Sequence, residues 1–112
     1  MTIGIITDNS EKWIAKVLKR LWVYLDLDKI QFVLIDNHST DNTVPYIVSI
    51  IGKRFMQEDR FKFYINTTKK EYKECEDMFS KLATSQKNVI IKENINKKEL
   101  EKLIRSVSKW YN

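Results

Sequence analysis

Four short apolar segments alternate along the chain with four longer segments whose apolar residues recur every three or four positions. Short apolar runs are typical of buried strands, and the longer repeat is typical of amphipathic helices. The pattern predicts strands at Thr2–Thr7, Ile30–Ile35, Phe61–Ile65 and Asn88–Lys92. It predicts helices from the Asp8–Ser10 turn to about Leu25, from about Asp41 to Phe55, from about Lys70 to Ser85, and from Asn96 to Trp110 and Tyr111.

Because strands and helices alternate, we expect residues 1–112 to form one α/β domain. The expected architecture is a three-layer, Rossmann-like parallel sheet of about four strands alternating with four helices and joined by right-handed crossovers. Apolar and polar residues alternate in Phe61–Ile65, which is typical of an edge strand with one wet face. Gly4 lies inside the first strand, where a missing side chain allows close approach. Cys75 lies on an apolar helix face and is expected in the core.

Charge and cysteine content narrow the functional classes. The net charge of +5 comes from 20 Lys and Arg against 15 Asp and Glu, which suits weak attraction to anions or a simple lysine-rich surface. We do not expect nucleic-acid binding as a function, because no recognition helix or zinc motif accompanies the charge. The single cysteine excludes an internal disulfide and a Cys-based zinc site, so a cytoplasmic location is the expectation. No apolar run approaches the ~18 residues of a membrane span.

The most polar stretch, Asp36–Thr43, directly follows the second predicted strand. In an open parallel sheet such a turn lies at the carboxyl edge, where ligands bind. A simpler interpretation is a capped helix start, in which Ser39, Thr40 or Asp41 accepts backbone N–H bonds. Capping accounts for one or two of these residues, but it does not account for Asp36 and Asn37.

Asp36–Thr43 resembles the Asp-Asp/Asn-Gly-Ser-Thr-Asp-x-Thr signature of family 2 glycosyltransferases, which have the GT-A fold. Ile5–Ile14 is similar to the opening strand, Thr-Tyr-Asn turn and first helix of that family. The resemblance covers residues 2–66 well and 67–94 loosely. It implies a truncated GT-A domain that contains the nucleotide-binding half.

Such enzymes move a sugar from a nucleotide diphosphate donor to an acceptor hydroxyl. By resemblance, Thr7 and Asn9 line the base and ribose, and Asn37 contacts the base. Asp36 either holds the turn or approaches the nucleotide. The resemblance also brings three neighbouring residues into the nucleotide-binding set, namely Asp8, Ser39 and Asp41.

Four features depart from the family pattern. His38 replaces the usual Gly, so the backbone there must avoid or tolerate a conformation that Gly adopts freely. Asp8 replaces a Tyr and removes a stacking ring. The Asp-x-Asp that holds Mg²⁺ or Mn²⁺ corresponds to Lys92–Asn96, where Glu93 is the only carboxylate and a weak candidate metal ligand. The acceptor half, with its general base, is missing from the sequence, because the chain ends one helix later.

Two functions stay open from the sequence. The first is a glycosyltransferase-like protein that binds a nucleotide or nucleotide-sugar donor and transfers a sugar with help from a homodimer or partner protein. The second is a non-catalytic interaction or assembly module that keeps the fold. Trp110 and Tyr111 either close the core or dock a partner. His38 is expected to be a solvated turn residue rather than a catalytic base.

Overall fold

The computed structural model describes residues 1–56 and 60–111. The strands are β1 (Thr2–Thr7), β2 (Gln31–Asp36), β3 (Phe61–Ile65) and β4 (Asn88–Ile91). The helices are α1 (Ile14–Tyr24), α2 (Thr43–Met56), α3 (Tyr72–Leu82) and α4 (Lys97–Tyr111), with a 3-10 turn, η1 (Leu27–Lys29), before β2. Each predicted strand and helix is present, with ends that differ by a few residues. Most of the loop expected after α2 falls on residues 57–59, which lie outside the described residues.

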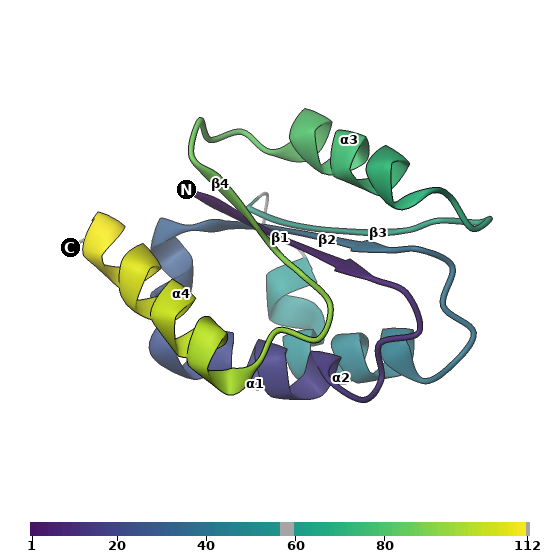
Figure 1. Cartoon of the computed structure of the whole chain (residues 1–112), viewed down its shortest axis with the longest axis horizontal. Helices are drawn as coiled ribbons and strands as arrows, with labels where there is room; N and C mark the ends of the chain where they lie inside the picture. Colours follow the sequence, from purple (N-terminus) through teal and green to yellow (C-terminus); the bar gives the residue numbers. More distant parts are fainter. Residues whose placement is uncertain (57–59, 112) are drawn as a thin grey trace.

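The strands form one parallel sheet in the order β3-β2-β1-β4. Helix α3 covers one face of this sheet, and α1, α2 and α4 lie against the other (Figure 1). The three-layer, Rossmann-like α/β architecture expected from the sequence is therefore confirmed. None of the described helices is long and apolar enough to cross a bilayer.

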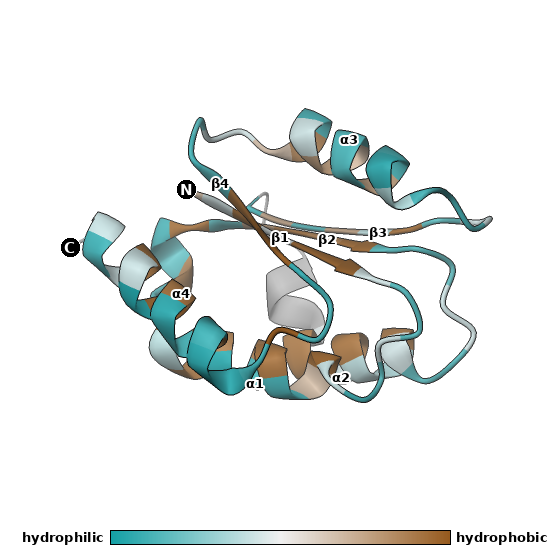
Figure 2. Cartoon of the chain, in the orientation of Figure 1, coloured by the Kyte–Doolittle hydropathy of each residue, from teal (hydrophilic) through white to brown (hydrophobic). Residues whose placement is uncertain are grey.

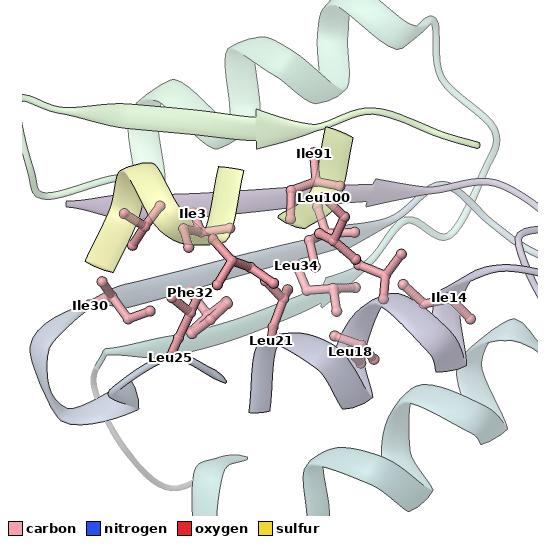
Figure 3. Packing of buried hydrophobic residues seen from close by; sticks show 14 of the residues in the cluster. Ile3, Ile14, Leu18, Leu21, Leu25, Ile30, Phe32, Leu34, Ile91 and Leu100 are labelled. Carbon is pink, nitrogen blue, oxygen red and sulfur yellow. The ribbon is translucent and has the colours of Figure 1, made fainter. Parts of the chain in front are cut away.

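Two hydrophobic clusters hold the layers together. The larger one fills the space between the sheet and the three-helix layer, where Leu18 and Leu21 of α1 meet Phe32 and Leu34 of β2 (Figure 3). The smaller one lies between the sheet and α3 and consists of Ile6, Val33, Ile35, Cys75 and Phe79. The strands are accordingly hydrophobic along much of their length, whereas the helices carry hydrophilic residues as well (Figure 2). Cys75 is fully buried, as expected.

Gly4 provides the close approach that its position in β1 suggested. It pairs with Val33 on one side and Ile90 on the other, at the centre of the sheet. An ideal Cβ on residue 4 would lie only 2.5 Å from Cε2 of Phe79, so the ring occupies the space that a side chain would need. The absence of a side chain at Gly4 thus lets α3 pack closely on β1.

The edge position of β3 is confirmed by the strand order, and Tyr64 is 45% exposed. Trp110 is 44% exposed and does not close the core, whereas the side chain of Tyr111 lies outside the described part of the structure. Asn96 followed three residues later by Glu99 is the pattern of a capping box, and α4 begins with such a cap, in which Asn96 Oδ1 accepts the Glu99 N–H at 2.8 Å. The side-chain amide of Asn96 in turn donates a hydrogen bond to Glu99 Oε1, also at 2.8 Å.

The Asp8–Ser10 turn offers three side chains that could cap α1, but the expectation that one of them does so is wrong. No side chain from Asp8–Ser10 bonds the first turn, and the carbonyl of Ser10 instead accepts the N–H groups of Trp13 and Ile14. The reason is that these side chains are engaged elsewhere. Ser10 Oγ accepts the Asp8 N–H, and Asn9 Oδ1 bonds the loop after β2.

Candidate functional site

The loops at the carboxyl edge of the sheet hold every non-glycine residue with positive φ in the described chain. These are Asn9 (φ 50°), His38 (φ 56°) and Asn94 (φ 61°), which follow β1, β2 and β4 respectively. Such backbone is sparsely populated and is found at functional sites when the surroundings fix it. At His38 the chain tolerates, rather than avoids, the conformation that Gly would adopt freely.

The loops that follow β1 and β2 are hydrogen-bonded to each other. The Asn9 N–H donates to Ser39 Oγ at 2.9 Å, and the Thr40 N–H donates to Asn9 Oδ1 at 2.8 Å. The Ser10 N–H donates to Thr43 Oγ1 at 2.7 Å. Residues about 30 positions apart in the chain therefore form one connected, polar surface after β1 and β2.

Asp36 is the buried anchor of this surface. Its carboxylate accepts Thr7 Oγ1 at 2.7 Å and Ser39 Oγ at 2.6 Å on one oxygen, and the Ser39 N–H at 2.9 Å on the other. Asp36 and Thr7 are fully buried and pair directly across β1 and β2. Of the two roles implied for Asp36, holding the turn is the one that its contacts match.

Asn37 points to the opposite side and fastens the loop after β3. Its Oδ1 accepts the Lys70 N–H at 2.9 Å and Asn66 Nδ2 at 3.1 Å, while its Nδ2 donates to the Lys70 carbonyl at 2.8 Å. The residue is only 4% exposed. A base edge could use these atoms only if the loop carrying Lys70 moved away.

Asp41 caps α2, so the helix-cap interpretation holds for this residue. Its Oδ1 accepts the Thr43 N–H at 2.9 Å, and its Oδ2 accepts the Glu11 N–H at 3.3 Å. Burial alone would raise the pKa of Asp41, but hydrogen bonds from the Thr43 hydroxyl, the Thr43 N–H and the Glu11 N–H hold that pKa below its ordinary value. Ser39 and Thr40 form contacts with the first loop instead of capping α2.

The lowered pKa of Asp41 predicts a pH-dependent contribution to stability. A carboxylate with a lowered folded-state pKa stabilises the fold above its unfolded pKa of about 3.9, and this contribution is lost as the pH falls through the folded-state pKa. Asp41→Asn keeps a capping oxygen but removes the charge. We expect the difference in unfolding free energy between wild type and Asp41→Asn to be constant above about pH 5. Below about pH 4 it should shrink in urea titrations.

Asp77→Asn is the matched control for this titration, because it removes one exposed carboxylate from α3 without touching the loops. If both variants change with pH in the same way, the hydrogen bonds around Asp41 contribute nothing specific.

The exposed groups at the same edge carry mixed charge. Lys69 Nζ lies 2.5 Å from Asp8 Oδ1, and both side chains remain partly exposed. His38 is exposed, as expected, with Nδ1 3.3 Å from the Asn66 carbonyl. Glu93 is exposed in the loop after β4. Burial raises the pKa of Tyr72 at the start of α3, and the charges of Glu76, Cys75 and Glu93 raise it further.

The residues present at this edge do not make a good metal site. Within residues 1–56 and 60–111, no three His, Cys, Asp or Glu side chains converge in a way that could hold a metal ion. Glu93 would be a single carboxylate ligand, whereas protein-bound Mg²⁺ usually depends on carboxylates together with substrate phosphates.

Two buried residues of this network, Thr43 and Asn66, were not assigned a role from the sequence. Asn66 is 5% exposed, donates to Asn37 and follows β3 directly, as Asn37 follows β2. A polar residue immediately after each buried strand is therefore the signal that could have identified it. The sequence does not reveal which of these residues bond one another and which face solvent.

Comparisons with known proteins add no relative. No family model, no curated protein and no solved structure matches this chain.

Proposed function

We propose that this chain is a glycosyltransferase-like protein that binds a nucleotide or nucleotide-sugar across the loops at the carboxyl edge of its sheet. The observation that carries the proposal is the left-handed backbone of His38, at φ 56°. This is the position at which the resembled signature has Gly, and Gly is the residue that suits such backbone. Left-handed backbone at the position of the signature Gly is what the resemblance leads one to expect, and this supports the proposal.

The polar residues of the site divide into two groups under this proposal. Thr7 and Asp36 are buried and preorganise the loops without touching a ligand. Asp8 and Asn9 face solvent and are the groups that would meet ribose hydroxyls or a base edge. Lys69, paired with Asp8, supplies a cation for a phosphate. Sugar transfer would additionally require an acceptor site and a general base from a second chain.

Thermal unfolding with UDP, UDP-glucose and GDP-mannose tests this proposal, each with and without Mg²⁺ or Mn²⁺. A ligand at about 100 times its Kd should stabilise the fold by roughly 2.7 kcal/mol, and the unfolding midpoint should rise. NMR shifts should centre on Asp8 and Asn9. A rise that requires the metal would bring Glu93 into the site. Flat midpoints with all three nucleotides, and no shifts at these loops, would contradict the proposal.

The second candidate is a non-catalytic assembly module, and the exposure of aromatic and apolar side chains on α1 and α4 favours it. Val23 is 73% and Tyr24 61% exposed, and Trp110 is 44% exposed near the end of α4. Tyr24 also lines a shallow pocket together with Ile104 and Arg105 of α4. A concentration-dependent dimer in sedimentation velocity, combined with flat nucleotide titrations, would favour this function over nucleotide binding.

A further inference from the structure

A groove lies between α1 and α4, on the helical face of the sheet that is opposite α3. The two helices follow β1 and β4, which are neighbours in the sheet, and both pack on the same face (Figure 1). The groove has a volume of 570 Å³. Its apolar wall comes from Trp13, Val17, Ile95 and Leu100. Sites for small molecules typically have volumes of about 300–1,000 Å³ and are mostly apolar with a few polar groups.

The charged side chains that line this groove are all cationic. They are Lys16, Lys19 and Arg20 of α1 and Lys97 at the start of α4. Arg20 Nη1 lies 3.4 Å from a carboxylate oxygen of Glu101, which compensates it in part. None of the three lysines forms an ion pair within the described residues. The first turn of α4 adds the positive end of a helix dipole beside Lys97.

Trp13 provides an independent indication of a missing partner. The residue is only 9% exposed and lines the groove. Its indole Nε1–H is buried and meets no acceptor among the described residues. Buried N–H groups are nearly always bonded, so an unpartnered one points to a water or a ligand that supplies the acceptor. Because this nitrogen is closed to solvent, an oxygen of a bound anion can fill this role only when the Trp13 ring turns toward the groove.

From these observations we infer that the α1–α4 groove binds a small organic phosphate with an aromatic or aliphatic body. The three uncompensated lysines attract the phosphate, the apolar wall holds the body, and an oxygen accepts the Trp13 N–H once the ring turns toward the groove. The groove is formed by residues that do not belong to the Asp8–Asn9 and Asp36–Asp41 loops. The inference therefore does not depend on the proposed nucleotide site.

Titration of the full chain with 1-naphthyl phosphate, followed by NMR of the tryptophan indole N–H groups, tests this inference. The chain has three tryptophans, so single Trp→Phe variants assign the three resonances. We expect a saturable shift at Trp13, with little change at Trp110. Lys16→Gln combined with Lys97→Gln should weaken binding at least tenfold. Inorganic phosphate lacks the aromatic body, and neutral 1-naphthol lacks the phosphate. Each should bind at least tenfold more weakly than 1-naphthyl phosphate.

Lys73→Gln combined with Lys87→Gln is the matched control. It removes the same charge from exposed positions that do not line the groove. This control should retain binding within twofold. Equal weakening in both double variants would reduce the effect to net charge and overturn the inference. So would equal binding of 1-naphthol, or an unchanged Trp13 resonance at saturating ligand. Shifts at Asn9 without shifts at Trp13 would support the nucleotide site alone.

Discussion

Gly4→Val should destabilise the fold by about 3 kcal/mol or more, because it overpacks a well-filled core. Buried β-branched residues normally favour strands, and Gly normally weakens them, so propensity alone predicts the opposite sign. The ring of Phe79 reverses the sign of the expected change in stability. A Cβ on residue 4 would meet Cε2 at 2.5 Å and Cδ2 at 2.6 Å, well inside the ~3.5–4.0 Å at which carbon atoms pack. Phe79 is 3% exposed and is itself packed in the cluster with Val33, Ile35 and Cys75.

A double-mutant cycle distinguishes this contact from a general intolerance at Gly4. Gly4→Ala alone should cost about 1–3 kcal/mol in urea unfolding. In a Phe79→Leu background the same change should cost little or even stabilise, because Gly4 does not have a positive φ and Ala restricts the unfolded chain. The coupling between the two changes should exceed about 1 kcal/mol. An unchanged cost of Gly4→Ala in both backgrounds would mean that the Phe79 ring is not the cause.

The hydrophobic pattern was sufficient to predict the elements and the layers of this fold. Strand length, apolar runs and helical spacing are local signals, and β3 could be recognised as an edge strand from Phe61–Ile65 alone. The strand order and the choice of face for each helix depend on contacts between distant segments. Gly4 is an example of such a distant contact. The space that a side chain at this position would need is occupied by the ring of Phe79, which lies 75 positions further along the chain.

The sequence placed polar residues after the first two strands, at the expected carboxyl edge of the sheet, but it did not show which of them bond one another. Polar residues after β1 and β2 do meet at the carboxyl edge. The sequence could not indicate that Asn37 would bond the Lys70 backbone, or that Asn9 would hold Thr40. A polar side chain can form hydrogen bonds with several different partners, and the sequence alone does not distinguish among them. Only the packed backbone decides which of them are buried and which remain available to a ligand.

Asp36→Ala should be the most damaging change at the carboxyl edge. It would leave the Thr7 hydroxyl, the Ser39 hydroxyl and the Ser39 N–H without their common acceptor. Each buried polar group that loses its partner costs about 1–3 kcal/mol, so the total loss should be about 3–5 kcal/mol. That is a large share of the roughly 5–15 kcal/mol by which a domain is stable. The measurement is urea unfolding monitored by far-UV circular dichroism.

Asp8→Ala is the matched control, since Asp8 follows β1 as closely as Asp36 ends β2. Its carboxylate is partly exposed and pairs with Lys69 in solvent, so its removal should cost less than about 1 kcal/mol. Asp36→Asn should fall between the two, because it keeps one acceptor oxygen and turns an amide donor toward the Ser39 N–H or hydroxyl. Equal losses for Asp8→Ala and Asp36→Ala would show that burial and the three hydrogen bonds do not set the importance of Asp36. The expected gradation would instead identify Asp36 as the residue whose buried hydrogen bonds hold the end of β1 and the loop after β2 together.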